Sequence, residues 1–230
     1  MCPMNWNIFE FNELESTNTT ALSYPVYSVI LAKKQTAGKG RLGRKWESPE
    51  GNLYTSFVLP DFKEKSALIS FVIALSAGQI LSEITKGIQL KWPNDILLDG
   101  RKLAGILLEK QNGKLIVGIG INLISCPKQE MLYPTTHLET SLNSKEILEK
   151  LIFYFNHNLE LFNQGFSHIR TEYKKMLKGI GEPITVNLPN QTLTGIFEDL
   201  DETGALLLKR ENKIIPILAG DVFFNNKETK

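Results

Sequence analysis

The 230-residue sequence is poor in the residues that build disulfides and metal sites. It has only two cysteines, Cys2 and Cys126, and three scattered histidines, His137, His157 and His168. Because Cys2 lies near the terminus and no metal-site spacing is present, we expect neither a structural disulfide nor a metal site built from these residues. Such cysteine usage is typical of a reducing cytoplasm, which is the compartment that we predict.

The sequence also lacks an excess of either charge and a long apolar run. Its 26 basic and 25 acidic residues leave a net charge of +1, which argues against a protein that coats nucleic acid. No apolar run approaches the ~18 residues of a membrane span, and the N-terminus has neither the basic start nor the apolar stretch of a signal peptide. We therefore predict neither DNA nor a membrane as a partner.

Apolar periodicity predicts an α/β fold of the α+β type, in which a mixed sheet is backed by helices. Helices are expected over 65–84, from Asn143 or Ser144 to about 162, and over 169–177. Asp99-Gly100 and Asn112-Gly113 are strong signals for two-residue hairpins. Strands are expected over 8–14, 27–32, 52–59, 88–92, 95–98, 102–110 and 114–122.

A break in this pattern marks a candidate domain boundary. The segment 179–183, Gly-Ile-Gly-Glu-Pro, contains two glycines and a proline. Beyond it, short strands separated by turns are typical of a small antiparallel barrel. We therefore expect one domain over residues 1–178 and a small β-barrel domain over 179–230. The strands of the barrel are expected over 184–188, 191–199, 204–209, 213–218 and 222–224.

The most informative segment is a basic, glycine-rich loop from about residue 34 to 51. No acidic residue occurs between Lys33 and Trp46, and cations alternate with glycines: Gly38, Lys39, Gly40, Arg41, Gly43, Arg44 and Lys45. Glycine lets backbone N–H groups approach an anion, and arginine adds bidentate donors. The pattern favours an anion-binding loop over a merely solvated one. The letters match G-x-G-x-x-G, but no amphipathic helix follows, and a Walker A spacing is absent.

Three further segments have weaker local signals. The hairpin at Asp99-Gly100 could bring Lys102 near Asn94 and Asp95, a set suited to a phosphate or a metal-bound nucleotide, although hairpin lysines are usually solvated. Gly118 and Gly120 alternate along one strand face, which suits either a flat ligand floor or close helix packing. Residues 16–18, Ser-Thr-Asn, are on local grounds a helix cap.

Taken together, these segments resemble the biotin–protein ligases. The matching segments occur in the family's order and cover the chain from about residue 8 to 178, while 204–208 and 220–222 are similar to the small SH3-like domain that ends such ligases. The matching segments are 15–18, 35–46, 91–95, 101–107 and 118–122. The resemblance implies an ATP-dependent ligase that forms biotinyl-5′-AMP and transfers biotin to a lysine of a carrier protein.

The same resemblance implies roles for individual residues. Catalysis would use Lys102, Arg41 and Arg44, while Asp95 would help to place Mg²⁺ carried by ATP. Biotin would contact Ser16, Thr17, Asn18, Gln35, Gly38, Lys39, Gly40, Arg41, Lys102, Gly105 and Gly118, with Gly120 also under its apolar part. ATP would contact Arg41, Arg44, Trp46, Asn94, Lys102 and Asn122. Because the adenylate is prone to hydrolysis, we expect residues 36–48 to be mobile without ligand and ordered with it.

The sequence departs from the family pattern at two places. Lys39 stands where many members carry arginine, so the charge is kept but the bidentate fork is lost. Only about ten residues precede the first motif, too few for a DNA-binding domain, so we expect a monofunctional ligase and not a repressor.

The expected partner is the biotin carboxyl carrier domain of an acyl-CoA carboxylase, and the resemblance allows a homodimer without specifying one. Three alternatives stay open. They are a lipoate or octanoate transferase or ligase of the same fold, a sensor that binds biotin without turnover, and, more remotely, a nucleic-acid-binding role for the basic loop.

Overall fold

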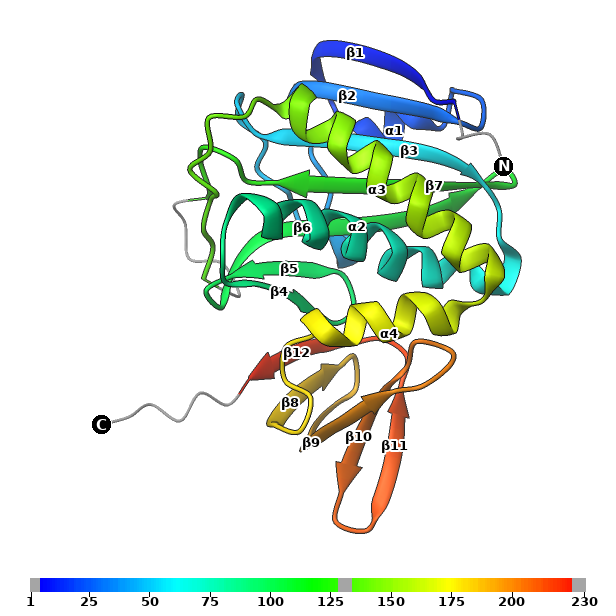
Figure 1. Ribbon diagram of the computed structural model, residues 1–230, viewed down its shortest axis with the longest axis vertical. Coiled ribbons are helices and arrows are strands. Elements are labelled where there is room, and N and C mark those ends of the chain that lie inside the picture. Colours follow the sequence, from blue (N-terminus) through cyan, green and yellow to red (C-terminus); the bar gives the residue numbers. More distant parts are fainter. Residues whose placement is uncertain (1–4, 128–133, 225–230) are drawn as a thin grey trace.

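The computed structural model describes residues 5–127 and 134–224, so Cys2 lies outside the described residues. It contains two sheets with helices packed against them (Figure 1), which confirms the predicted α/β class. The larger sheet has the strand order β1-β2-β3-β7-β6-β5-β4. β1 pairs parallel with β2 and β2 pairs antiparallel with β3, so the sheet is mixed. Its strands are β1 (Asn7–Leu14), β2 (Ser28–Gln35), β3 (Leu53–Pro60), β4 (Ile88–Lys91), β5 (Asp95–Leu98), β6 (Arg101–Gln111) and β7 (Lys114–Ile121).

Two tight hairpins set the register of the strands that carry the glycines. Asp99-Gly100 joins β5 to β6 and Asn112-Gly113 joins β6 to β7, and all four residues have positive φ values between 49° and 77°. These are the φ signs of a type I′ turn, whose twist matches that of the flanking strands. The register that results places Gly105 of β6 opposite Gly120 of β7.

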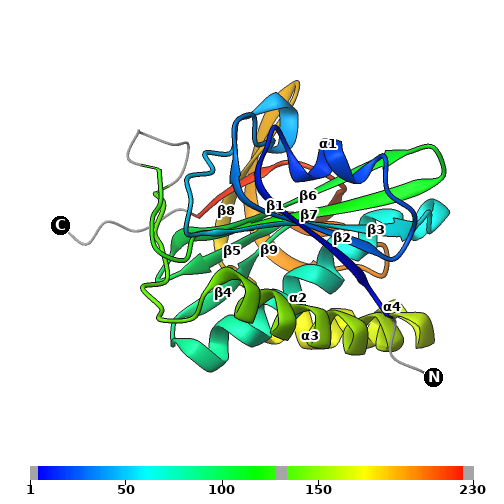
Figure 2. The ribbon, with the colours of Figure 1, turned by 90° about the horizontal axis from the view of Figure 1, so that it is seen from above.

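Helices cover the two faces of the larger sheet unequally (Figure 2). The face opposite α1 is covered by α2, α3 and α4, and α3 begins as predicted at Asn143, whose side chain forms a capping box with Glu146. The helix predicted over 65–84 starts instead with a 3₁₀ segment. The bounds are α1 (Thr17–Ala21), η2 (Lys63–Leu68), α2 (Ile69–Ile84), α3 (Ser144–Gln164) and α4 (Phe166–Met176).

One helical segment of this face passes a test of length and composition for a membrane span. Lys63–Ile84 is long and apolar enough to cross a membrane on those two grounds. However, 72% of its most apolar stretch is buried inside the protein, because α2 packs against α3, α4 and the sheet. An all-round apolar helix is what a core position between layers requires, so we interpret Lys63–Ile84 as a core helix.

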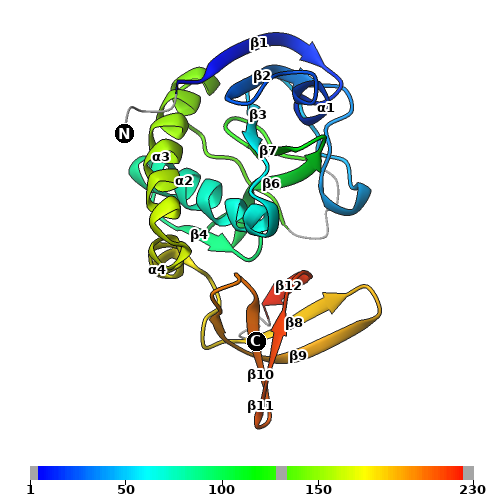
Figure 3. The ribbon, with the colours of Figure 1, turned by 90° about the vertical axis from the view of Figure 1, so that its right-hand side faces the viewer.

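The smaller sheet is antiparallel and has the strand order β11-β10-β9-β8-β12. The predicted strands are present, but the expected barrel is not closed, since no pairing between β11 and β12 occurs among the described residues. Figure 1 and Figure 3 show the hairpin of β10 and β11 projecting away from the rest of the molecule. The strands are β8 (Pro183–Leu188), β9 (Gln191–Leu200), β10 (Leu206–Arg210), β11 (Lys213–Ile217) and β12 (Asp221–Phe224).

The two sheets share one apolar core. A single cluster of buried side chains runs from Phe71 of α2 to Val186 and Phe197 of the smaller sheet. At the junction, the buried Trp92 indole donates its N–H to the carbonyl oxygen of Gly204 over 2.9 Å. The smaller sheet is therefore held against the larger one by both packing and a buried hydrogen bond. The division between residues 178 and 179 stays a prediction.

Candidate active site

A single cavity on the α1 side of the larger sheet brings together most of the predicted site residues. The cavity and the open solvent at its mouth together hold about 760 Å³ of non-protein space. Its lining residues are Ser16, Thr17, Asn18, Gln35, Lys39, Gly40, Arg41, Arg44, Lys45, Trp46, Asn94, Asp95, Lys102, Gly105, Ile106, Leu107, Gly118, Ile119, Gly120 and Asp221.

Glycines of β6 and β7 make room for the side chains that cover the cavity floor. A Cβ atom at Gly120 would lie 2.5 Å from the indole nitrogen of Trp46, and one at Gly105 would lie 3.0 Å from the same ring. A Cβ atom at Gly118 would lie 2.1 Å from the side-chain oxygen of Asn18. Gly105 and Gly120 are thus required to make room for Trp46, while Gly118 is required for the close packing of Asn18 of α1 against β7.

One end of the cavity is a wall of polar groups at the start of α1. Ser16 is the N-cap of this helix, so the local capping interpretation is correct, and its side chain also lines the cavity. The backbone N–H of Thr17 donates to the amide oxygen of Gln35 over 2.8 Å. The amide nitrogen of Gln35 donates to Ser48 over 2.8 Å, and Ser48 donates to the carbonyl oxygen of Trp46. This wall is therefore linked to the glycine-rich loop.

Lys102 lies at the centre of the cavity and is not a solvated hairpin lysine. Its ammonium is 2.7 Å from a carboxylate oxygen of Asp95 and 5.4 Å from the centre of the Trp46 ring. The backbone N–H of Lys102 donates to the carbonyl oxygen of Pro134, and its carbonyl oxygen accepts from the N–H of Thr136. These two bonds fix the start of β6. The side chain is only 20% exposed. The β5–β6 hairpin thus presents a fixed cation to the cavity.

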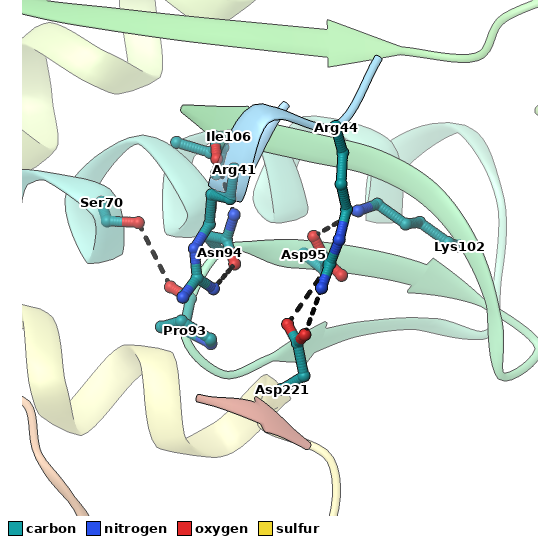
Figure 4. A network of polar contacts seen from close by, with 9 residues as sticks. All are labelled: Arg41, Arg44, Ser70, Pro93, Asn94, Asp95, Lys102, Ile106 and Asp221. Carbon is teal, nitrogen blue, oxygen red and sulfur yellow. Dashed lines mark hydrogen bonds and ion pairs between the residues drawn. The ribbon is translucent and has the colours of Figure 1, made fainter. Parts of the chain in front are cut away.

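The glycine-rich loop directs two arginines across the cavity (Figure 4). A 3₁₀ turn over Arg41–Gly43 separates them. Arg41 donates to the amide oxygen of Asn94 over 2.8 Å, and that amide is oriented by its own donation to the carbonyl oxygen of Ile106. The guanidinium therefore has a neutral acceptor as its partner and keeps its full charge for an anion.

Arg44 contacts a residue of the smaller sheet. Its guanidinium forms two hydrogen bonds with the carboxylate of Asp221 at the start of β12 (Figure 4). Burial opposes ionisation of Asp221, but the hydrogen bonds and charge of Arg44, with Arg41 and Lys91 nearby, outweigh it and keep the pKa of this carboxyl below its usual value. The smaller sheet thus supplies an acidic group to the cavity wall.

Lys91 lies behind this wall and is 4% exposed. Its ammonium is 5.9 Å from the ring centres of both Phe223 and Phe224. Burial lowers the pKa of Lys91 to about 8, although the charges of Asp95 and Asp221 oppose the shift. Lys91 does not line the cavity, and it acts on the site through its charge, which is attracted by Asp95 and Asp221 and repelled by Lys102.

Two predicted site residues lie outside the cavity lining. The carbonyl oxygen of Gly38 accepts from the backbone of Trp46, so Gly38 shapes the loop. The side chain of Asn122 is 1% exposed and donates to the carbonyl oxygen of Thr136, so it supports the segment that flanks Lys102. For a metal, the described part of the chain offers no group of three or more His, Cys, Asp or Glu side chains.

The comparisons with known proteins agree with this geometry. Residues 11–124 match the model of the biotin/lipoate A/B protein ligase family, and residues 179–225 match that of the biotin protein ligase C-terminal domain. The chain is 35% identical to a biotin–[acetyl-CoA-carboxylase] ligase of Paracoccus denitrificans, over 91% of this chain and 97% of that protein. The chain belongs to the biotin protein ligase family.

Other members of the biotin protein ligase family match in sequence and in structure. A biotin protein ligase from Aquifex aeolicus, solved in complex with biotin and ATP, superposes with a TM-score of 0.84 at 33% identity, covering 94% of this chain and 97% of that one. The bifunctional ligase/repressor BirA of Salmonella typhimurium is 32% identical over 86% of this chain and 67% of its own length. The fold of this ligase is therefore that of its relatives.

Several residues of the ligase site were missed by sequence reasoning. Asp221 was noted only within the tail, because nothing local to β12 indicates that it faces the glycine-rich loop. Ser56 and Glu109, which hydrogen-bond to the polar wall, lie in ordinary strands. The period-2 alternation of β6, in which residues 105, 107 and 109 share a face, is a signal that could have found Glu109. Lys45, Ile106, Leu107 and Ile119 also line the cavity without having been predicted.

Replacing Asp221 with asparagine should loosen the ligand-free glycine-rich loop of the ligase. The amide keeps one acceptor for Arg44 but loses the charge, and a partly exposed ion pair of this kind stabilises by ~0.2–1 kcal/mol. Trypsin should therefore cleave residues 36–48 of the variant roughly two- to fivefold faster, because cleavage follows the population of the open loop. The matched control is Asp199→Asn, which removes a carboxylate of the smaller sheet that is bound to Lys174 of α4. It should leave the cleavage rate unchanged. Equal cleavage of all three proteins would show that Asp221 does not hold the loop.

Proposed function

We propose that this chain is an ATP-dependent ligase that activates biotin as biotinyl-5′-AMP and transfers it to a lysine of a biotin carboxyl carrier domain of an acyl-CoA carboxylase. The observation that carries the proposal is the position of Lys102, a fixed cation between a glycine-lined floor and two arginines. An apolar acid with a polar head fits the floor and wall, and a nucleotide phosphate fits the arginines. The biotin and ATP found in the Aquifex relative support the same pairing of ligands.

In this proposal, the polar wall and the glycine floor hold biotin. Ser16, Thr17 and Gln35 bind the ureido head, while Gly105, Gly118 and Gly120 lie under the apolar ring and chain. Asn18, Lys39 and Gly40 border the same space. Since Ser16 and Thr17 are buried, an acid without the ureido group would cover their polar atoms without offering them a hydrogen bond, which gives the site its selectivity.

In the first step, a carboxylate oxygen of biotin attacks the α-phosphorus of ATP. A C–O–P linkage forms, the P–O bond to the leaving group breaks, and pyrophosphate departs. Carboxylate and triphosphate repel one another, so Lys102, Arg41 and Arg44 supply the positive charge that the transition state needs, with Asn94 and Trp46 beside the nucleotide. Lys102 acts as a protonated cation throughout.

In the second step, the neutral ε-amine of the carrier lysine attacks the acyl carbon of the adenylate. The amide bond forms, the bond between the acyl carbon and the phosphate oxygen breaks, AMP leaves, and the proton of the amine passes to the solvent. Arg41 and Arg44 retain the adenylate until then, and the ordered loop over residues 36–48 keeps water away. We expect the carrier to dock by pairing with a free sheet edge.

The described residues do not form a ready site for Mg²⁺. Asp95 and Asp221 are the carboxylates of the cavity lining, and each is already bound to a cation, Lys102 or Arg44. We therefore expect Mg²⁺ to arrive bound to the triphosphate, with Asp95 near it. We also keep as proposals a domain boundary between residues 178 and 179, a cytoplasmic location, and a homodimer as one form of the protein.

The proposal is tested by mass spectrometry of the purified protein with ATP, Mg²⁺ and either biotin or lipoate. We expect biotinyl-AMP with biotin and no acyl-AMP with lipoate. Lipoyl-AMP alone would assign the chain to lipoate chemistry. Binding of biotin without any adenylate would make the chain a sensor and would refute the proposed catalysis. Addition of a carrier domain should then convert biotinyl-AMP into AMP and a biotinylated lysine.

A further inference from the structure

We propose that Glu109 is a specificity-determining positioning residue: through Asn18 and Ser56 it orients the hydroxyl of Thr17 so that this oxygen accepts a hydrogen bond from the ligand. The inference rests on the proposed binding of biotin, whose ureido N–H group is the donor that we assign to the Thr17 oxygen. None of these contacts involves the phosphate end of the cavity.

A chain of short hydrogen bonds connects Glu109 to Thr17. The side-chain amide nitrogen of Asn18 is 2.7 Å from a carboxylate oxygen of Glu109. The oxygen of the same amide is 2.6 Å from the hydroxyl of Ser56, which is 2.8 Å from the hydroxyl of Thr17. Asn18 is 4% exposed, Thr17 5% and Ser56 0%. The chain is therefore shielded from water, where hydrogen bonds polarise one another most strongly.

The chemistry of the groups fixes the direction of the hydrogen bonds between Glu109, Asn18 and Ser56. A carboxylate can only accept, so the Asn18 amide must turn its NH₂ group toward Glu109 and its oxygen toward Ser56. Ser56 has one hydrogen, and it must donate that hydrogen to the amide oxygen. The Ser56 oxygen is then left to accept from Thr17.

The Thr17 hydroxyl can therefore act toward a ligand in the cavity only as a hydrogen-bond acceptor. The single hydrogen of Thr17 is directed either to Ser56 at 2.8 Å or to the amide oxygen of Gln35 at 3.1 Å. In both cases the Thr17 oxygen keeps a lone pair for the cavity that it lines. The ureido group carries two N–H donors, so this polarity favours biotin over acids that have no such donor.

The face of β6 explains why Glu109 can do this without lining the cavity. Residues 105, 107 and 109 share one face of the strand, and Gly118 of β7 lies opposite Leu107. Because Gly118 has no side chain, the Asn18 amide can lie flat between β7 and Glu109. Figure 2 shows α1, which carries Asn18, over these two strands.

The test compares Glu109→Gln with the matched variant Glu13→Gln, which makes the same change at an exposed carboxylate bound to Lys34. An amide at 109 can donate as well as accept, so the direction of the chain is no longer imposed. We expect Glu109→Gln to raise the Kd for biotin and for desthiobiotin, which keeps the ureido group, by roughly 10-fold or more, as for loss of a charge-assisted hydrogen bond. The KM for ATP and the thermal midpoint should stay near those of Glu13→Gln.

A double-variant cycle with Ser56→Ala tests the relay itself. If Glu109 acts through Ser56, the Kd of the double variant should be no higher than that of the weaker-binding single variant. Additive effects, a parallel rise of the KM for ATP, or a biotin Kd for Glu109→Gln within about twofold of the wild type would each overturn the inference. Failure of the wild-type protein to bind biotin would instead refute the proposed function. The two cases are separated by titrating the wild-type protein first, because the role of Glu109 is overturned only if the wild type binds biotin and the variants do not behave as expected.

Discussion

Replacing Lys102 with methionine is expected to remove biotinyl-AMP formation, with a loss of at least about 10²–10³-fold in rate. The methionine keeps the length and apolar stem of the side chain but removes the ammonium that we propose to lie between the biotin carboxylate and the α-phosphate. Lys102 is 20% exposed and its backbone is fixed by Pro134 and Thr136, so we expect the methionine side chain to occupy the same place. The measurement is single-turnover formation of biotinyl-AMP by mass spectrometry.

Two controls separate loss of the charge from loss of the fold. Lys110→Met makes the same change on the same strand at an exposed lysine bound to Asp61, and it should retain full activity. Lys102→Met also leaves Asp95 without its partner, so the double variant Asp95→Asn/Lys102→Met should recover any lost stability while staying inactive. A rate for Lys102→Met within tenfold of the wild type would contradict the assigned role.

Adding one methyl group at Gly118 is expected to weaken biotin binding roughly 10- to 100-fold, since overpacking of this kind costs about 1–3 kcal/mol. The new Cβ atom would lie 2.1 Å from the side-chain oxygen of Asn18. Asn18 would have to move, and its bonds to Ser56 and Glu109 would break. Isothermal titration with biotin measures the effect, and a melting curve shows whether the fold is intact.

The clash at Gly118 predicts a specific pattern of rescue. Asn18→Ala removes the atoms that the new methyl group would meet, so adding Gly118→Ala to Asn18→Ala should cost little further affinity. If the two changes are additive instead, the methyl group must act on the ligand directly and not through Asn18. The cycle therefore measures how much of the affinity for biotin depends on the side chain of Asn18.

The sequence predicted those parts of the structure that are decided within a few residues. The dipeptides Asp99-Gly100 and Asn112-Gly113 form the expected hairpins, because few other residues adopt two successive positive φ values. Asn143 caps the expected helix. Alternating glycines on β7 allowed either a ligand floor or close helix packing, and the structure shows both, with Gly120 against Trp46 of the cavity and Gly118 against Asn18 of α1. The family resemblance then supplied the ligands.

The features that could not be predicted depend on contacts between distant segments. Asp221 and Arg44 are separated by 177 positions, and only the docking of the smaller sheet brings them together. Asn18 and Glu109 are 91 positions apart, and their contact depends on the strand order β3-β7-β6. Closure of the small antiparallel sheet could not be predicted for a similar reason, because strand periodicity predicts β11 and β12 but does not state whether they pair.

The buried hydrogen bond between Trp92 and Gly204, within one core that spans both sheets, has a consequence for how this protein can change over time. A tail that was tethered only by a linker could be lost or exchanged as a cassette, with the remainder keeping its stability. Here Gly204 also packs against Phe71 of α2, where an added side chain would come within 2.8 Å of the ring. A side chain added at Gly204 of the tail would therefore disturb the core of the larger part, and each part restricts which residues the other can accept.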